Sequence, residues 1–444
     1  MNARCVALVG ILLVVRVPIA CGDGGIGGCM ASSCHGSSQP DAPIWQRAGK
    51  VWFDNDPHAQ AYAILHNEAS RAMLERLLGR PLANEAERKQ ILESRCVSCH
   101  ASENTNVDLR PLGIHCGSCH GPLNAWGEDH YSLATLSKKE SRFDGTERVA
   151  LPDWSTQVRK CAECHIGSIR DSNPSMHVDH QLMAAGHPPM PFEFSNYLER
   201  YPAHWSLAED ADSEQWMRWR IGKLETAKAR LQLLIDRCQI EGDWPEFTEY
   251  SCSSCHHELD ATGWRAGSKQ KANQGGVAVW DDWYLNYLEL AIEPAPETPW
   301  RTFASQLDAL RSTMESKTPD RMLAANHASQ LLESLQQSQG NLSRTNMDRD
   351  AVKQSLENLV DIEWPPHSWE QGVQWTLAVR AMTRSVQLPS PELNLGDDFY
   401  DGFFVSPRTW RRGQSSSFDG SSRFSPGALE EYRSGLRQHL GKQP

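Results

Sequence analysis

Ten of the thirteen cysteines occur in pairs, and a histidine directly follows each pair. Four pairs have the spacing Cys-x-x-Cys-His, which is the attachment site of c-type haem. In such a site the two thiols bind the haem vinyl groups, and the histidine becomes an axial ligand of the iron. The motifs therefore predict four covalently bound haems. They consist of Cys96, Cys99 and His100; Cys116, Cys119 and His120; Cys161, Cys164 and His165; and Cys252, Cys255 and His256.

A fifth pair, Cys29 and Cys34, has four spacer residues and is followed by His35. The longer loop can still present both sulfurs and the imidazole to one side of a porphyrin, so we predict a fifth haem here. Among the remaining cysteines, we expect Cys238 to be a small buried residue near the end of a helix. A disulfide between Cys238 and Cys21 is the alternative.

Zinc and disulfide bonds are the alternative chemistries for these cysteines. The pairs at Cys96 and Cys116 have the spacing of a zinc ribbon, and a disulfide framework suits an exported protein. Neither chemistry requires a histidine after every pair, whereas haem attachment does. Haem c is therefore the favoured interpretation, and a zinc- or disulfide-stabilised binding module is the weaker hypothesis.

Twelve histidines lie outside the motifs and are candidates for the second axial position of each iron. A six-coordinate haem is suited to carrying electrons, whereas an open sixth position lets a haem bind and transform a small molecule. The identity of the distal ligands therefore separates an electron carrier from an enzyme.

The order of the motifs resembles that of the tetrahaem cytochromes c that accept electrons from hydroxylamine oxidoreductase. The resemblance covers about residues 29–190. It is carried by the sequence Asp56-Pro57-His58-Ala59-Gln60-Ala61 after the first motif, and by Gly113-Ile114-His115 before the motif at Cys116, which Gly121-Pro122, Trp126 and His130 follow.

The resemblance also implies distal ligands. By analogy, His58 would be the distal ligand of the haem on His120, and His130 would be that of the haem on His35. The haem on His100 would be five-coordinate and open, and the haem on His165 would take its partner from a downstream histidine.

Downstream, His180 and His187 are the favoured ligands for the haems on His165 and His256, in either order. His177 and His204 are the alternatives. The sequence departs from the family pattern in its long first spacer, its fifth motif and its C-terminal extension. It has no Cys-x-x-Cys-Lys, so the lysine-ligated haem of nitrite reductases is absent.

The first twenty residues have the pattern of an export signal, in which Arg4 precedes an apolar run over residues 6–15. A bilayer-spanning helix needs about 20 apolar residues, so this run is too short to span comfortably. Cleavage after Ala20, lipidation of Cys21 and retention as an N-terminal anchor stay open. Each predicts a protein in the periplasm or at the cell envelope, with membrane contact only through an N-terminus that is lipidated or uncleaved.

The charge balance argues against nucleic acid as a partner. The 444 residues carry 44 basic and 56 acidic side chains, which gives a net charge of −12. Nucleic-acid binders usually show a basic excess on one face. An acidic surface could instead steer a basic redox partner.

We expect a mainly α fold with extensive irregular loops, since haems fill much of the core of such proteins. The predicted segments are a leader (1–20), a multihaem cytochrome c domain (21–275), a helical region (276–386), and a tail rich in Pro, Gly and Ser with a short terminal helix (387–444). Apolar residues at three- and four-residue spacing predict the helices, and we interpret the charged face of the helix over 214–238 as solvated. The predicted helices span 58–79, 84–95, 214–238, 281–292, 300–316, 319–338, 347–361, 368–384 and 427–439.

These observations favour an exported pentahaem cytochrome c that passes electrons between redox partner proteins. The sequence names neither the donor nor the acceptor. The alternative is a haem oxidoreductase that acts on a small inorganic nitrogen or sulfur species at the open haem on His100.

Overall fold

The structure is a computed structural model and is mostly helical in the parts of the chain that it describes. Within these parts, the strands are β1 (Ser168–Arg170) and β2 (Asn173–Met176), which form one antiparallel pair. This confirms the predicted mainly α fold with loops. The described residues are 29–102, 107–121, 153–170, 173–188, 190–205, 214–255, 277–292, 300–342, 349–362, 369–388 and 426–441.

Several sequence predictions lie outside these described residues. They include the leader over residues 1–20, most of the predicted tail, and the histidines His130 and His256. No helix in the described part of the chain is long and apolar enough to cross a membrane.

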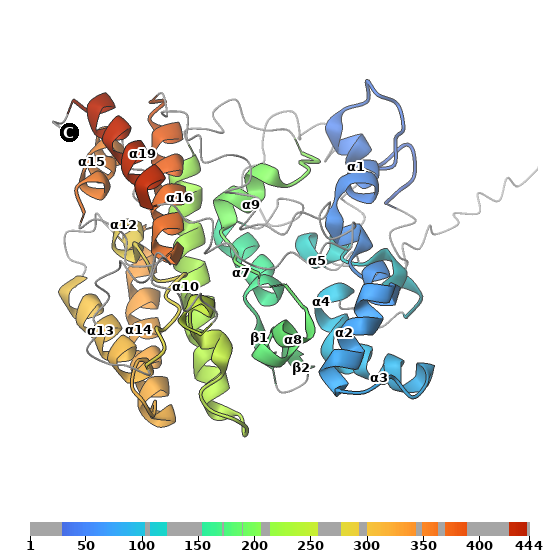
Figure 1. The fold of residues 1–444 in the computed structure, drawn as a ribbon. Coiled ribbons are helices and arrows are strands. Elements are labelled where there is room, and N and C mark those ends of the chain that lie inside the picture. The colour runs from blue at the N-terminus through green and yellow to red at the C-terminus, as the bar shows by residue number, and fades with distance from the viewer. Residues whose placement is uncertain are drawn as a thin grey trace, which may run out of the picture.

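The N-terminal helices lie at one side of the molecule (Figure 1). They are α1 (Ala48–Asn55), the 3-10 helices η2 (Pro57–Gln60) and η3 (Ala63–His66), α2 (Glu68–Leu78) and α3 (Glu85–Arg95). The helix predicted over 84–95 is confirmed. The single helix predicted over 58–79 is wrong, because the side chain of Asn67 accepts a hydrogen bond from the backbone N–H of Ser70 and begins α2 there.

The middle of the molecule contains α7 (Trp154–His165), the β1–β2 hairpin, α8 (His180–Ala185) and α9 (Phe194–Arg200). None of these elements was predicted. Asp153 and Asp179 are the N-caps of α7 and α8, and each side chain accepts a backbone N–H three residues later. The two aspartates are therefore the signals from which these short helices were predictable.

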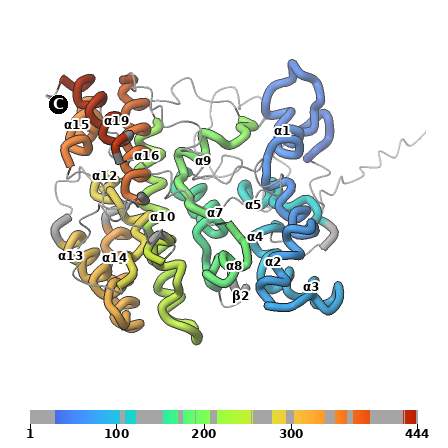
Figure 2. The backbone as a smooth tube through the Cα atoms, viewed as in Figure 1, coloured from blue at the N-terminus to red at the C-terminus, as the bar shows by residue number. Residues whose placement is uncertain are grey.

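The long helix α10 (Gln215–Gln239) connects this middle layer to the C-terminal helices (Figures 1 and 2). It contacts α7 and α9, and it also contacts α12 (Leu288–Ile292), α14 (Arg321–Leu342) and α16 (Trp369–Ser385). Cys238 is 6% exposed near its end, as expected. The helix predicted over 214–238 is confirmed.

The interpretation of the charged face of α10 as solvated is wrong. Contacts on more than one side bury Lys223 and Arg230, among other charged residues of this helix. The ammonium of Lys223 donates to the carbonyl of Trp283 at 2.9 Å and to the side chain of Gln374 at 2.8 Å. Hydrogen bonds to protein atoms thus replace the solvent that the sequence pattern suggested.

The C-terminal helices share one hydrophobic core with α10. Trp216 and Trp219 of α10 stack with ring centres 4.8 Å apart, and the same cluster contains Leu310, Leu331 and Trp375. Helix α12 is shorter than predicted, whereas the other predicted C-terminal helices are confirmed. The latter are α13 (Trp300–Met314), α14, α15 (Arg349–Val360), α16 and α19 (Pro426–His439).

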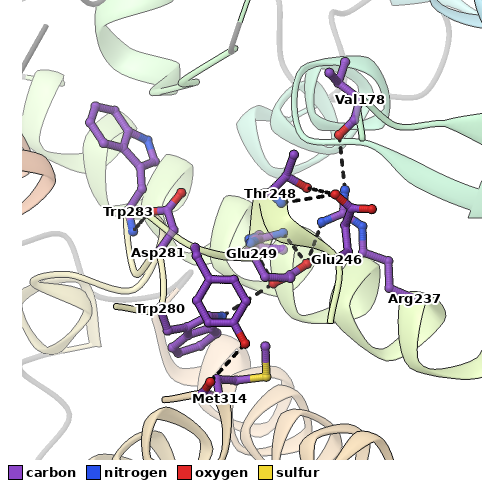
Figure 3. Close-up of polar contacts among 11 residues, drawn as sticks. Val178, Arg237, Glu246, Thr248, Glu249, Trp280, Asp281, Trp283 and Met314 are labelled. Carbon is purple, nitrogen blue, oxygen red and sulfur yellow. Dashed lines mark hydrogen bonds and ion pairs between the residues drawn. The ribbon is translucent and has the colours of Figure 1, made fainter. Parts of the chain in front are cut away.

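A buried ion-pair network fixes the end of α10 to the segment that precedes the last cysteine pair. Glu249 is fully buried, and its carboxylate contacts Arg230 at 2.7 Å and Arg237 at 2.5 Å. Arg237 also donates to the carbonyl of Val178 at 3.3 Å, and Glu249 lies beside Trp280 (Figure 3). One carboxylate thus connects α10, the β2–α8 loop and the segment after residue 277.

We predict that Glu249→Gln lowers the free energy of unfolding by about 3–5 kcal/mol, because it leaves two buried guanidinium groups without their counter-charge. Urea unfolding of the wild type and the variant measures this difference. The control is Asp54→Asn, which breaks the exposed pair with Lys50 and should lower the free energy by less than about 1 kcal/mol. Equal losses in the two variants would contradict the prediction.

The same carboxylate predicts a pH dependence. Burial alone would raise the pKa of Glu249, but the charges of Arg230 and Arg237 outweigh it and lower the pKa below its usual value of 4.5. Its stabilising contribution is therefore fully present above pH 4.5 and is lost as the pH falls through the lower pKa of the folded state. The difference in unfolding free energy between wild type and Glu249→Gln should be constant above pH 4.5 and narrow below it.

Candidate haem-binding site

Three of the predicted motifs end short or medium helices. His100 is the last residue of α4 (Val97–His100), His120 of α5 (Cys116–His120), and His165 of α7. The long-spacer motif closes as a turn, in which the backbone N–H of His35 donates to the carbonyl of Cys29 at 3.0 Å. The extra spacer residues therefore do not separate this histidine from its first cysteine.

The motif at Cys252, the last along the chain, lies against the C-terminal helices. Cys252 begins the 3-10 helix η8 (Cys252–Ser254), and Cys255 follows it. The hydroxyl of Ser251 donates to the carboxylate of Glu370 in α16 at 2.6 Å. The structure thus fixes this cysteine pair to a different part of the molecule from the other four.

Thiols from four different motifs, those at Cys29, Cys96, Cys116 and Cys161, lie close enough to interact with one another. The motif at Cys116 lies between those at Cys29 and Cys161, and the motif at Cys96 adjoins the one at Cys161. The attachment points therefore form a contiguous group. The interacting thiols are Cys29 with Cys116, Cys119 with Cys161, and Cys99 with Cys164.

Burial favours the neutral thiol at several of the motif cysteines, whereas the hydrogen bond with Cys164 lowers the pKa of the Cys99 thiol. Burial raises the pKa of the Cys96 and Cys116 thiols to about 11. Zinc binds the thiolate form, which this environment disfavours. Neutral, apolar surroundings suit a covalent bond to a porphyrin better than they suit a zinc ribbon.

Each of three motif histidines lies against a histidine from elsewhere in the chain. The ring centres are separated by similar distances, and the ring planes are steeply inclined. The pairs are His58 with His165 (6.0 Å, 78°), His100 with His187 (6.5 Å, 90°), and His120 with His204 (6.1 Å, 60°).

These distances fit two imidazoles on opposite sides of one iron. With metal–nitrogen bonds of about 2 Å and about 1.1 Å from each nitrogen to its ring centre, two axial rings have centres about 6 Å apart. The planes of axial imidazoles can take any mutual angle about the bond axis, so the observed inclinations are compatible as well.

Hydrogen bonds at Nδ1 orient four of the candidate ligands. Every acceptor is an oxygen without a proton, so Nδ1 carries the hydrogen and the lone pair is left on Nε2, the atom available to a metal. The bonds run from His35 to the carbonyl of Trp45 (2.7 Å), from His100 to that of Ala61 (2.7 Å), from His187 to that of Pro188 (2.8 Å), and from His58 to the carboxylate of Asp56 (2.9 Å).

Burial keeps three of the candidate imidazoles, His100, His165 and His187, in the metal-binding form. Burial lowers the pKa of His165 to about 3 and that of His100 to about 4, and it also lowers the pKa of His187. The rings are therefore neutral near pH 7, and neutral imidazole is the form that binds a metal.

A contact between α2 and α8 positions His187. Helix α8 ends at Gly186, whose backbone is left-handed (φ 114°) and whose absent side chain makes room for Arg76. The guanidinium of Arg76 donates to the carbonyl of Ala185 at 2.6 Å. This contact holds the following residue, His187, beside the ring of His100.

Asp56 positions His58. Its buried carboxylate is the N-cap of η2, where it accepts both the backbone N–H and the Nδ1–H of His58. Burial would raise the pKa of Asp56, but the hydrogen bonds from His58 and Tyr201 lower it below its usual value. Gly113 is required beside this turn, because a side chain there would lie 2.3 Å from the His58 carbonyl.

The observed neighbours differ from those implied by the resemblance. His58 was expected to pair with His120 but lies beside His165. His100 was expected to be open but faces His187, which was expected at His165 or His256. The physical reason for the second pair is that β2, the strand before α8, packs on α4, which carries His100, while α8 itself packs on α2.

His180 contacts the segment that precedes the motif at Cys252. Its backbone N–H donates to the carboxylate of Glu246 at 2.9 Å, and its ring packs against Phe247 with ring centres 5.5 Å apart. His180 was expected at the haem on His165 or on His256; this segment leads directly to Cys252, and the assignment of His180 stays a prediction. His130, the expected partner of His35, lies outside the described residues.

His204 is only an alternative ligand in the sequence prediction, and Tyr201 has no predicted role. The ring of His204 lies beside His120, and the hydroxyl of Tyr201 donates to Asp56 from 145 residues away. The sequence Tyr201-Pro202-Ala203-His204-Trp205 carries polar aromatic residues next to a proline, which was the available signal.

The comparisons with known proteins identify one family. Residues 30–121 match the sequence model of the family described as cytochrome c554 and c-prime. No curated protein and no solved structure matches the chain. The matched segment contains His35, His58, His100 and His120. The predicted resemblance is confirmed over this segment, which is similar to the multihaem c-type cytochromes of the cytochrome c554 and c-prime family.

Proposed function

We propose that this protein is an exported pentahaem cytochrome c that carries electrons between redox partner proteins. The family match supports covalently bound haem c and electron transfer. Haem c supplies a one-electron iron(III)/iron(II) couple. The proposed attachment residues are the cysteines Cys29, Cys34, Cys96, Cys99, Cys116, Cys119, Cys161, Cys164, Cys252 and Cys255, with His35, His100, His120, His165 and His256 as proximal ligands.

The three histidine pairs carry this proposal. In it, His58 is the distal ligand opposite His165, His187 is opposite His100, and His204 is opposite His120. The support is the 6.0–6.5 Å between ring centres, together with the Nδ1 hydrogen bonds that leave Nε2 of His58, His100 and His187 available. For the remaining two haems we keep His130 opposite His35 and His180 opposite His256.

This ligand set favours an electron carrier over an enzyme. Substrate chemistry at a haem needs an open coordination position, and the resemblance implies one at His100. The ring of His187 lies beside that of His100, with ring centres 6.5 Å apart, and is the proposed ligand at this position. The alternative function, reaction of a small nitrogen or sulfur species at the haem on His100, is therefore disfavoured.

The arrangement of the motifs suits transfer through the protein. Four of the attachment sites adjoin one another in space. Their order is the motif at Cys29, then those at Cys116, Cys161 and Cys96. Their ligands do not change between oxidation states in a six-coordinate site, so little reorganisation accompanies electron transfer. The export pattern of residues 1–20 supports a periplasmic or envelope location, and the net charge of −12 supports attraction to a basic partner.

We predict five haems by intact mass when the protein is expressed with export and a c-type maturation system. The double variant Cys29→Ser, Cys34→Ser should lose the mass of one haem, because only the long-spacer motif is removed. A wild type with four haems would show that this motif has another role.

We predict that His187→Gly converts one low-spin haem into a high-spin haem, since it removes the proposed distal ligand of the iron on His100. Electron paramagnetic resonance of the oxidised protein measures the change, and added imidazole should restore the low-spin signal. The control is His66→Gly, which removes an exposed histidine and should leave every signal unchanged. A high-spin haem already present in the wild type, unaffected by His187→Gly, would favour the enzyme instead.

A further inference from the structure

We propose that Asp56 selectively lowers the reduction potential of the haem bound by His58 and His165, and that Tyr201 moderates this effect. The inference rests on the proposed function, in which these two histidines bind one iron. Asp56 and Tyr201 touch the ligand and not the iron, so they are positioning residues that act through His58.

The Asp56 carboxylate is buried and directed at the back of the His58 ring. It is 2% exposed, and Oδ1 accepts the Nδ1–H of His58 at 2.9 Å and its backbone N–H at 3.0 Å. Oδ2 accepts the hydroxyl of Tyr201. Three hydrogen bonds thus hold the carboxylate in one orientation.

A carboxylate in this position increases the electron density on Nε2. An imidazole that donates to an anion is a stronger base and a stronger ligand than one that donates to a neutral oxygen. A stronger donor, with a negative charge behind it, stabilises iron(III) more than iron(II). Burial weakens dielectric screening and so makes this difference larger than it would be in water.

The other oriented ligands lack this feature. His35, His100 and His187 each donate Nδ1–H to a backbone carbonyl, which carries no net charge. Among the four candidate ligands with such a bond, His58 is therefore the one whose basicity a carboxylate raises. The geometry predicts that its haem has a lower potential than it would have with a carbonyl behind the ligand.

Tyr201 acts in the opposite direction. Its hydroxyl donates to the carboxylate oxygen that His58 does not use, and this withdraws negative charge from the Nδ1 bond. Its ring also lies 6.0 Å from that of His58 and stacks on Trp205 at 5.8 Å. Removing only the hydroxyl should strengthen the effect of Asp56 while leaving this packing in place.

The test is a potentiometric titration of the mature haem-loaded protein, followed by visible absorbance and electron paramagnetic resonance. His58→Met, which replaces the proposed ligand, identifies the component that belongs to this haem. Asp56→Asn should then raise the potential of that component and leave the others in place, since the amide keeps an oxygen for the N-cap bond and loses the charge. Tyr201→Phe should lower the potential of the same component.

Asp153→Asn is the matched control. Asp153 also caps a helix that carries a ligand of this haem, but it lies at the far end of α7, about 18 Å along the helix from His165. It should leave the component unchanged. Three results would overturn this inference alone. Asp56→Asn could leave the reduction potential of this component unchanged, it could shift the potentials of all components equally, or it could shift the potential in the same direction as Tyr201→Phe. If His58→Met alters no haem signal, the proposed ligand set fails as well.

Discussion

The hydrogen bond at Nδ1 of four candidate ligands, His35, His58, His100 and His187, is the constraint on which the site depends. An imidazole can bind iron through Nε2 only if its other nitrogen carries the proton, and only if the ring is held at the right angle. The structure satisfies both conditions with oxygens that are fixed by backbone geometry. The carbonyl of Ala61 comes from the segment between η2 and η3, and Asp56 caps η2. The irregular segment after α1 therefore orients two of the proposed ligands, His58 and His100.

Helix α10 has a corresponding role for the whole molecule. It packs against α7, which ends at His165, and also against the C-terminal helices. Its buried arginines connect to Glu249, which lies three residues before Cys252. The C-terminal helices contain no haem motif, but they bury the helix that supports α7. We infer that they contribute to the site by packing, because they hold in place the helix α10, which supports the helix that ends at the proposed ligand His165.

The sequence predicted what depends on local spacing, and it failed where distant segments meet. Five Cys–His motifs predict the attachment sites, and apolar periodicity located α10 and α14. The charged face of α10 was misinterpreted because periodicity shows which side chains share a face of the helix. It does not show which faces other helices later in the chain will cover. The break at Asn67 was visible as an N-cap residue within an otherwise helical pattern. The partners of His58 and His100 could not be derived, because α7 and α8 reach these rings through contacts that no local pattern encodes.

The three histidine pairs extend beyond the segment that matches the family. Each pair joins one residue inside the matched segment, 30–121, to one residue beyond it. His58, His100 and His120 lie inside, whereas His165, His187 and His204 are supplied by α7, by the end of α8 and by the segment after α9. The matched segment therefore holds only half of each proposed ligand set. A stable site needs the chain to continue at least to residue 205, and the packing of α7 and α9 on α10 holds those later ligands in place.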